Sequence, residues 1–390
     1  MSFQMYVPTR ILFGAGQLSN LSAQRLPGKK AMIVISNGKS ARESGALLKL
    51  EEQLQKAGTE SVVFDKIMAN PLKSTVMEGA AFARENDCDF LVALGGGSVM
   101  DASKAIAAMA TNDGDLWDYV SGGTGKEKTL EKEPLPIIAI TTTAGTGSEV
   151  DQYGVISNEE TNEKIGFGGY DSLFPRLAVV DPELMKSVPP KFTAYQGFDA
   201  LFHSVECYIS AAANLMGDMY ALTAIENIGA YLPRAIKDGS DMEAREHVAF
   251  ANTLSGVVMT ISACTSEHSM EHAMSAYHHE LPHGAGLIMI SKAYFTHFIE
   301  KHACDERFVR MAQALGKKDA AKPMDFITAL AELQEQCGVA ELKMSDYGIR
   351  PDEFMTMAKN ARETMGGLFA CDPLPLSDEE CAAIFEKSYR

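Results

Sequence analysis

The histidines of this 390-residue chain are concentrated in one part of it. All nine lie between residues 203 and 302, and the first 202 residues contain none. Any one of them alone is better explained as a helix-surface or hydrogen-bonded core histidine. Their concentration, next to suitable carboxylates, favours a metal site instead.

The spacing of these residues indicates how they would meet. Asp199 and His203 are four residues apart, and so are His268 and His272, so each pair shares one helix face about one turn apart. His283 stands between a proline and a glycine, which predicts that a helix has ended and that a turn presents the imidazole. One carboxylate with two or three neutral imidazoles suits Fe(II) or Zn(II).

A glycine-rich turn in the first half suits a phosphate group. Residues 89–94 are an apolar run of the kind buried in parallel sheets, and Gly95, Gly96, Gly97 and Ser98 follow it. The glycines allow close approach to the backbone, and the next helix offers free N–H groups at its positive end. Ser98 can cap that helix or bind the phosphate. The alternative is a purely structural turn, since the motif is not Gly-x-Gly-x-x-Gly.

A second loop of small polar residues follows the strand expected at 136–141. It contains Thr142, Thr143, Thr146 and Ser148, whose hydroxyls suit ribose or pyrophosphate. Two such loops at strand ends favour a dinucleotide over a lone phosphate.

Strand-like and helix-like segments alternate in the first half. Strands are expected at 31–36, 61–64, 89–94, 136–141 and 177–180, with helices at 47–57 and 76–86. From about residue 190 the helical period dominates, with helices expected at 193–210, 214–231, 242–275, 285–300, 305–315, 322–336, 351–363 and 377–388. We therefore expect an α/β dinucleotide-binding domain with a doubly wound parallel sheet over residues 1–185, and an all-α metal-binding, catalytic domain over residues 186–390.

Composition excludes several classes of protein. The net charge of −17 argues against a nucleic-acid partner, which requires basic patches. No apolar run reaches 18 residues and no secretory signal is visible, so neither a membrane span nor export is expected. Seven scattered cysteines without a Cys-x-x-Cys indicate reduced thiols in the cytoplasm. Cys207 and Cys264 fall near the expected metal site but are interpreted as small buried hydrophobes.

Together these motifs resemble the iron-dependent (group III) alcohol dehydrogenases over nearly the whole chain. The matching pieces are Phe13-Gly-Ala-Gly16, Asn70-Pro71, the Gly95 to Lys104 turn, the Thr142 to Glu149 loop, Lys164, Asp181-Pro182, Asp199-x-x-x-His203, His268 and Pro282-His283-Gly284. The resemblance implies a dinucleotide-binding half, a helical half in a dehydroquinate synthase-like arrangement, and a homodimer or larger homo-oligomer.

The resemblance also implies a metal held by one aspartate and three histidines. Carried over residue by residue, the ligands are Asp199, His203, His268 and His283. His272 matches a family histidine that lines the substrate or nicotinamide pocket, and we expect it to relay the proton or to position the coenzyme. The segment before His283 is about one residue longer than in the family and carries an extra pair, His278 and His279. We interpret both as loop histidines, with replacement of His283 by either as the alternative.

The turn after the first expected strand bears on the coenzyme. In family members that prefer NAD, this turn carries an acidic residue that binds the adenosine ribose. Here it reads Asn37, Gly38, Lys39 and Ser40 and has no carboxylate. A carboxylate would repel a 2′-phosphate, whereas Asn37, Lys39 and Ser40 can accept one, so the turn favours NADP(H) over NAD(H). The alternative is that Lys39 is a solvated surface lysine.

Three further positions are expected near the coenzyme. Asn70 lies in a matching piece, Asp101 would support the phosphate loop or cap its helix, and Lys164 would contact the coenzyme. A structural salt bridge is the alternative for Lys164.

The expected reaction is hydride transfer between NAD(P)(H) and a small primary alcohol or aldehyde at a centre of Fe(II) or Zn(II). The chain would then be a metal-dependent alcohol dehydrogenase or aldehyde reductase. A zinc polyol (glycerol-type) dehydrogenase or a dehydroquinate synthase-like lyase is the alternative on the same fold, although those groups typically use three protein ligands. A nucleotide- or metal-binding regulatory protein without turnover is the alternative from another class.

Overall fold

The computed structural model describes residues 3–390, which form two compact units. One unit is Val7–Ser187, and the other is Val188–Arg390 together with residues 3–6. The first contains all the strands, and the second is helical.

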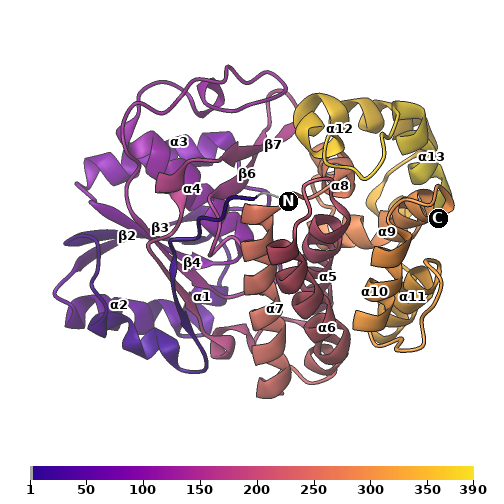
Figure 1. Ribbon diagram of the computed structural model, residues 1–390. Helices are drawn as coiled ribbons and strands as arrows, with labels where there is room; N and C mark the ends of the chain where they lie inside the picture. Colours follow the sequence, from indigo (N-terminus) through magenta and orange to yellow (C-terminus); the bar gives the residue numbers. More distant parts are fainter. Residues whose placement is uncertain (1–2) are drawn as a thin grey trace. The chain divides into compact units, whose positions relative to one another are not determined.

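A parallel six-stranded sheet forms the centre of the first unit (Figure 1). Its strands are β1 (Arg10–Phe13), β2 (Lys30–Ser36), β3 (Glu60–Ile67), β4 (Phe90–Gly95), β5 (Ile137–Thr141) and β8 (Leu177–Val180), in the spatial order β1-β8-β5-β4-β2-β3. Both neighbours of β2 are later in the chain, so the strand order reverses there, as in doubly wound sheets. The predicted fold class is confirmed, although β1 was not predicted.

Helices cover both faces of this sheet, which is why its four central strands, β2, β4, β5 and β8, are almost entirely buried. They are α1 (Ser40–Glu43), α2 (Ala46–Lys56), α3 (Lys73–Glu85) and α4 (Gly97–Thr111), with short 3₁₀ turns η1 (Gln17–Ala23), η2 (Leu116–Asp118), η3 (Asp171–Leu173) and η4 (Pro182–Met185). Along β4, Leu91 and Ala93 pack on the side of α3 and α4, while Val92 and Leu94 pack on the side of α2.

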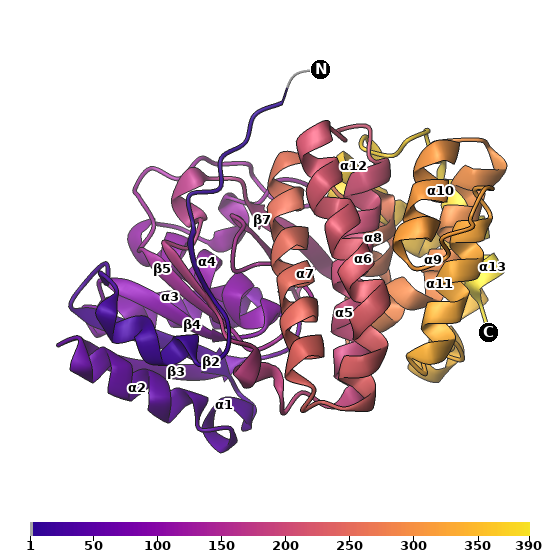
Figure 2. The ribbon, with the colours of Figure 1, turned by 60° about the horizontal axis from the view of Figure 1, so that its bottom comes forward.

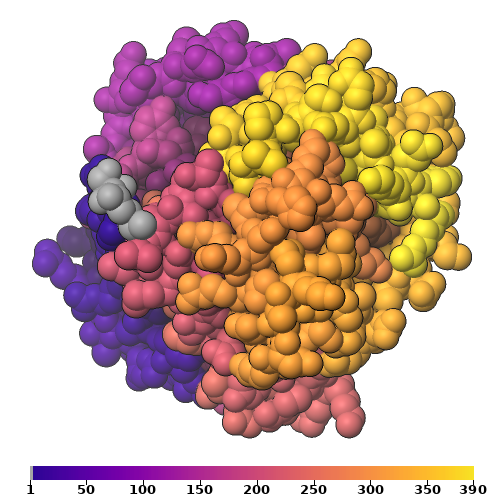
Figure 3. Space-filling view, turned by 45° about the vertical axis from the view of Figure 1, so that its right-hand side comes forward, coloured from indigo at the N-terminus to yellow at the C-terminus, as the bar shows by residue number. Residues whose placement is uncertain are grey.

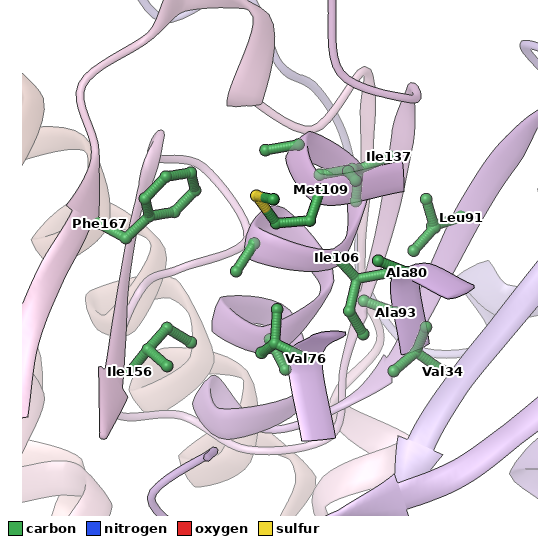
Figure 4. Packing of buried hydrophobic residues seen from close by; sticks show 14 of the residues in the cluster. Val34, Val76, Ala80, Leu91, Ala93, Ile106, Met109, Ile137, Ile156 and Phe167 are labelled. Atoms are coloured by element: carbon green, nitrogen blue, oxygen red, sulfur yellow. The ribbon is translucent and has the colours of Figure 1, made fainter. Parts of the chain in front are cut away.

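A two-stranded antiparallel hairpin, absent from the predicted elements, covers the outer side of α4. It consists of β6 (Tyr153–Asn158) and β7 (Glu163–Gly168). Figure 4 shows Ile106 and Met109 of α4 between the side chains of the sheet and those of Ile156 and Phe167 on the hairpin. α4 is therefore buried on two sides.

The second unit is a bundle of helices (Figure 2). They are α5 (Pro190–Ile209), α6 (Leu215–Lys237), α7 (Met242–Ile261), α8 (Ser266–Tyr277), α9 (His283–Glu300), α10 (Asp305–Ala314), α11 (Asp325–Gln336), α12 (Phe354–Phe369) and α13 (Asp378–Ser388), with 3₁₀ turns η5 (Met344–Tyr347) and η6 (Pro351–Glu353). α5, α6 and α7 pack on one another. Figure 3 shows the segments that follow residue 280, from orange to yellow, forming one continuous surface of this unit.

The single helix predicted over 242–275 is wrong, because the chain bends by 107° between α7 and α8. The bend is held from α5 and α6: Asn214 donates to the carbonyl of Ile261, and Ser262 donates to that of Cys207. Both helices are buried over much of their surface, so their apolar pattern runs on through the bend. No single helix among residues 3–390 is long and apolar enough to cross a membrane; α7 and α8 pass that test only as a bent pair.

Candidate functional site

One side of the candidate metal centre comes from α5. Asp199, His203 and Glu206 recur at intervals of four and three residues, so they share one helix face. All three are buried, as α5 is on nearly every side from Thr193 to Ile209. Asp199 Oδ1 lies 3.6 Å from His203 Nε2.

The other side comes from the first turns of α8 and α9. The Nε2 atoms of His268 and His283 each lie 3.4 Å from Asp199 Oδ1. Ligand atoms of Asp199, His268 and His283 lie within 4.8 Å of one another, and the rings of His203 and His268 stack at 4.3 Å. The structure thus brings together the four residues predicted as ligands.

His283 begins α9 directly, which corrects the expectation that it sits in a turn. Its neighbour Gly284 explains how α9 reaches the site. A Cβ at Gly284 would lie 2.2 Å from the carbonyl oxygen of Tyr195 on α5, so only glycine allows this approach.

Two buried glutamates, not predicted from the sequence, hold the ligand histidines. Glu206 accepts a hydrogen bond from His268 Nδ1, and Glu271 accepts one from His283 Nδ1. A neutral imidazole that donates from Nδ1 keeps a lone pair on Nε2. Here Nε2 faces the oxygen of Asp199, and two lone pairs would repel each other, so the contact must hold either a proton on Nε2 or a metal ion between the two atoms. The donor set therefore fits a divalent metal ion such as Fe(II) or Zn(II).

The electrostatics of the cluster are those of a site short of positive charge. Burial raises the pKa of Asp199, but His203, His283 and the hydrogen bond from His268 outweigh it, so that its pKa lies well below the usual value. Burial lowers the pKa of His268, but Glu206 foremost outweighs it and raises that pKa well above its usual value. Buried carboxylates so close together are tolerated when a cation is shared among them.

The remaining histidines differ in their surroundings. His272, the predicted catalytic residue, is buried, with its ring 5.2 Å from that of His283 and its Nδ1 2.7 Å from Met365 Sδ. Met365 has non-helical torsions inside α12 (φ −135°, ψ 43°), and this kink brings its thioether to His272. His278 faces Glu353, at 3.3 Å, and His279 is exposed. Neither belongs to the groups that the described residues place within metal-binding reach.

The predicted coenzyme loops lie side by side at the carboxyl edge of the sheet. β4 and β5 are neighbours, with Gly95 opposite Thr141. A Cβ at Gly96 would lie 2.9 Å from the side chain of Thr143, and one at Gly97 would lie 2.3 Å from that of Thr146. The two glycines are therefore needed for the loops to touch. α4 begins at Gly97 without a side-chain cap, so its first N–H groups remain available for an anion.

Asp101 and Ser148, two of the predicted coenzyme contacts, are bonded to each other within the protein. Ser148 donates to Asp101 Oδ1 at 2.7 Å, and the amide of Val155 donates to Oδ2 at 3.0 Å. Buried Lys104 donates to Ser148 and to Asp151, both at 2.7 Å. Burial foremost raises the pKa of Asp101 to about 6. These bonds hold the 141–149 loop and the hairpin against α4, whose end Asp101 does not cap.

The remaining predicted coenzyme residues lie after β2, after β3 and on strand β7 of the hairpin. Asn37, Gly38, Lys39 and Ser40 are all exposed at the carboxyl end of β2, next to β4 in the sheet. After β3, on the other side of β2, Asn70 adopts a left-handed torsion (φ 53°). Lys164 is buried on β7, opposite Ser157. Ligands of such sheets bind beyond the strand ends where the order reverses, and the turn after β2 and the glycines after β4 lie there.

A parallel dinucleotide-type sheet and a helical unit with an Asp/His cluster are the two parts that a metal-dependent dehydrogenase requires. Comparison with known families agrees: the profile of the iron-containing alcohol dehydrogenases matches residues 8–182, and the C-terminal profile of the same family matches residues 193–389. The chain therefore belongs to the iron-containing alcohol dehydrogenase family.

Relatives resemble the chain along its whole length. The 1,3-propanediol dehydrogenase of Klebsiella pneumoniae is 34% identical over 402 aligned positions that cover 100% of both chains. The probable NADH-dependent butanol dehydrogenase 1 of Bacillus subtilis is 32% identical over 92% of this chain and 93% of its own length. Among solved structures, an archaeal halo-thermophilic alcohol dehydrogenase from a Red Sea brine pool matches with a TM-score of 0.93 and 34% identity, over 100% of this chain and 99% of its own.

Proposed function

We propose that the chain is a metal-dependent alcohol dehydrogenase or aldehyde reductase that transfers hydride between a nicotinamide coenzyme and a small primary alcohol or aldehyde. One observation carries the proposal: three histidine nitrogens converge within 3.4–3.6 Å of one oxygen of Asp199. Two of these histidines, His268 and His283, are oriented by buried glutamates. Family membership supports iron as the metal.

The residues proposed to hold the ion are Asp199, His203, His268 and His283. A divalent ion in this position supplies Lewis-acid polarisation of the alcohol or aldehyde oxygen. Zn(II) suits the same donors, and family membership is what favours Fe(II) here. Four protein donors argue against the zinc polyol and lyase alternatives, for which three are typical.

His272 is proposed either to accept the proton that the reaction releases or to position the coenzyme. Oxidation of an alcohol removes a hydride from carbon, which reduces the nicotinamide, and a proton from the hydroxyl group. His272 is buried, and it is a titratable group close to the ligand His283 that is not itself proposed as a ligand. It either takes that proton or positions the coenzyme.

The coenzyme is proposed to bind at the carboxyl edge of the sheet. Gly95, Gly96, Gly97 and Ser98 would receive the pyrophosphate at the start of α4, with Thr142, Thr143 and Thr146 on the other side. Exposed Lys39 would pair with a 2′-phosphate, which favours NADP(H). One relative is named for NADH, which lacks that phosphate, so this part of the proposal depends on the turn after β2 alone.

The substrate is proposed to be a short primary alcohol or diol, or its aldehyde. The names of the relatives support this class, since they refer to 1,3-propanediol and butanol.

The test is aldehyde-dependent oxidation of NADPH and NADH by protein that has been stripped of metal and restored anaerobically with Fe(II) or Zn(II). We expect activity only after metal is restored. Restored protein that binds coenzyme but reduces no member of a broad aldehyde panel would contradict the proposed reaction. Equal activity of stripped and restored protein would contradict the metal centre.

A further inference from the structure

A chain of buried polar groups continues outward from Glu206, away from the proposed ligands. Its members are Thr265, Tyr294 and Asp372, with Ser266 beside them. Thr265, Ser266 and Tyr294 are completely buried, and Asp372 is 6% exposed. We call Thr265, Tyr294 and Asp372 the outer chain.

The outer chain bonds to the carboxylate oxygen of Glu206 that His268 Nδ1 does not use. Thr265 donates to Glu206 Oε2 from its amide at 2.8 Å and from its hydroxyl at 2.9 Å. His268 Nδ1 bonds to the other oxygen, Oε1. The orientation of the Glu206 carboxylate is therefore fixed from both ends.

Tyr294 links Thr265 to Asp372. Its hydroxyl lies 2.9 Å from Thr265 Oγ1, 3.0 Å from Asp372 Oδ1 and 3.1 Å from Ser266 Oγ. One hydroxyl has one proton and two lone pairs, so three partners saturate it. The phenol is thus held in one position, and it holds Thr265 in turn.

The number of available protons determines which way the hydrogen bonds of the outer chain can run. Three oxygen–oxygen contacts connect Glu206, Thr265, Tyr294 and Asp372 in series, but Thr265 and Tyr294 supply only two protons. If Asp372 carries a proton, that proton fills the third contact and every donor points toward Glu206, whereas with an ionised Asp372 it is Tyr294 that donates to Asp372. The pKa of Asp372 is raised to about 7, mainly by burial and to a small extent by the negative charge of Glu206. A pKa this high agrees with a retained proton.

Glu206 and the members of the outer chain come from separate parts of the fold. Glu206 is on α5, Thr265 precedes α8, and Tyr294 is on α9. Asp372 follows α12 and accepts from the amide of Ser266 at 2.9 Å, while the carbonyl of its neighbour Cys371 accepts from the amide of Ala211 at 2.8 Å. The C-terminal segment is thereby connected to a proposed ligand 104 positions earlier in the sequence (372 − 268).

We propose that Tyr294 and Asp372 are positioning residues of the metal centre, which act through Thr265 on the carboxylate that orients His268 and so raise the affinity for a divalent ion. A group that orients a ligand histidine holds its lone pair toward the ion before binding, which removes part of the cost of ordering it. The proposal rests on the metal site of the proposed function.

The test measures the affinity of the metal-free, full-length protein for Zn(II) and, anaerobically, for Fe(II), by competition with a chromophoric chelator. Tyr294→Phe removes one hydroxyl from the outer chain. Tyr208→Phe is the matched control, because Tyr208 is equally buried in the same unit but outside the chain. We expect Tyr294→Phe to weaken binding about threefold to tenfold, and Glu206→Gln, which acts on the ligand directly, about 10-fold to 100-fold. Tyr208→Phe should leave the affinity unchanged.

Two further comparisons separate positioning from general loss of structure. If Tyr294 acts through Glu206, adding Tyr294→Phe to Glu206→Gln should weaken binding less than it does in the wild type. Asp372→Asn can both donate and accept, so it should retain the affinity that Asp372→Leu loses. Thermal unfolding of each metal-free variant serves as the control for folding.

The outcomes distinguish this inference from the proposed function. A wild-type protein that binds neither ion contradicts both. A wild-type protein that binds the ions, with equal affinities in Tyr294→Phe and Tyr208→Phe, contradicts the positioning role alone. Full additivity of Tyr294→Phe and Glu206→Gln would also overturn it, because it would mean that Tyr294 acts by another route.

Discussion

The carboxyl edge of the sheet and the Asp/His cluster perform binding in different ways. At the sheet edge the candidate contacts are backbone groups and short side chains, and glycines allow two loops to touch. In the cluster they are carboxylate and imidazole side chains from three helices, and buried glutamates orient two of the imidazoles. A site made of backbone groups requires residues without a Cβ, whereas a site made of side chains requires further residues that orient those side chains. Different substitutions should therefore disrupt the sheet edge and the Asp/His cluster.

The largest effect is expected at Asp199, whose oxygen is common to all three histidine contacts. Asp199→Asn keeps the shape of the side chain but removes the charge that would be shared with the ion. We expect metal-dependent activity to fall about 1000-fold or more. Coenzyme binding, measured by fluorescence titration, should be unchanged.

Asp113→Asn is the control for Asp199→Asn, because it makes the same chemical change on a side chain that is 97% exposed. It should leave activity unchanged. Full activity of Asp199→Asn would remove Asp199 from the proposed ligand set.

The titration of Asp372, which belongs to the outer chain behind the Asp/His cluster, should change the free energy of unfolding with pH. The pKa of Asp372 is raised by burial from 3.8 to about 7, so the folded state retains a proton that the unfolded state loses. The resulting stabilisation is complete below pH ~4 and is lost as pH rises to ~7, at up to about 1.4 kcal/mol per pH unit. Asp372→Asn does not titrate and should lack this loss.

Thermal unfolding of the two metal-free proteins over this pH range measures that difference. The wild type should lose stability relative to Asp372→Asn as pH rises. Parallel pH profiles would show that Asp372 is already ionised in the folded protein at low pH.

The sheet edge should be most sensitive to a single methyl group. In Gly97→Ala the new Cβ would lie 2.3 Å from Thr146 Cγ2, so the loops must separate. Overpacking of this kind costs about 1–3 kcal/mol, which predicts coenzyme affinity about fivefold to 150-fold weaker. Metal affinity should not change.

Gly217→Ala tests whether any added methyl group has this effect. The nearest atom to its Cβ is at 3.4 Å, an ordinary contact, so coenzyme affinity should match the wild type. If Gly97→Ala weakened the metal and the coenzyme equally, the two sites would not be separable in the way proposed.

The same contrast explains what could be predicted from the sequence. Glycine turns after apolar strands and histidines four residues from a partner are local patterns, and the structure brings both sets together as expected. Glu206 carried a usable signal, since it lies on the Asp199 face of α5, but a buried glutamate and a solvated one look alike in sequence. Asp372 carried no such signal, because only tertiary folding brings it to Tyr294.

The missed elements have equally physical causes. β1 has four residues and is an edge strand that stays partly exposed, and its apolar run of three residues is too short to be identified as a strand. The β6–β7 hairpin is interrupted by Gly154 and Gly166, which weaken the strand pattern. The bend between α7 and α8 is held by hydrogen bonds with distant residues, Asn214 and Cys207, and not by a proline or glycine at the break.

The smallest expected effect concerns coenzyme preference and tests the exposed end of the sheet edge. Lys39 is solvated, and a charge pair in such a position contributes about 0.2–1 kcal/mol, so Lys39→Ala should lower kcat/KM for NADPH by about two- to fivefold and leave that for NADH unchanged. Lys56→Ala, an exposed lysine at the end of α2, is the matched control and should change neither value. High salt should reduce the wild-type preference toward that of Lys39→Ala, because exposed charge pairs are screened. An unchanged ratio of the two coenzymes in Lys39→Ala would mean that Lys39 does not contact the 2′-phosphate, and the preference would then have to come from the neutral residues of the same turn.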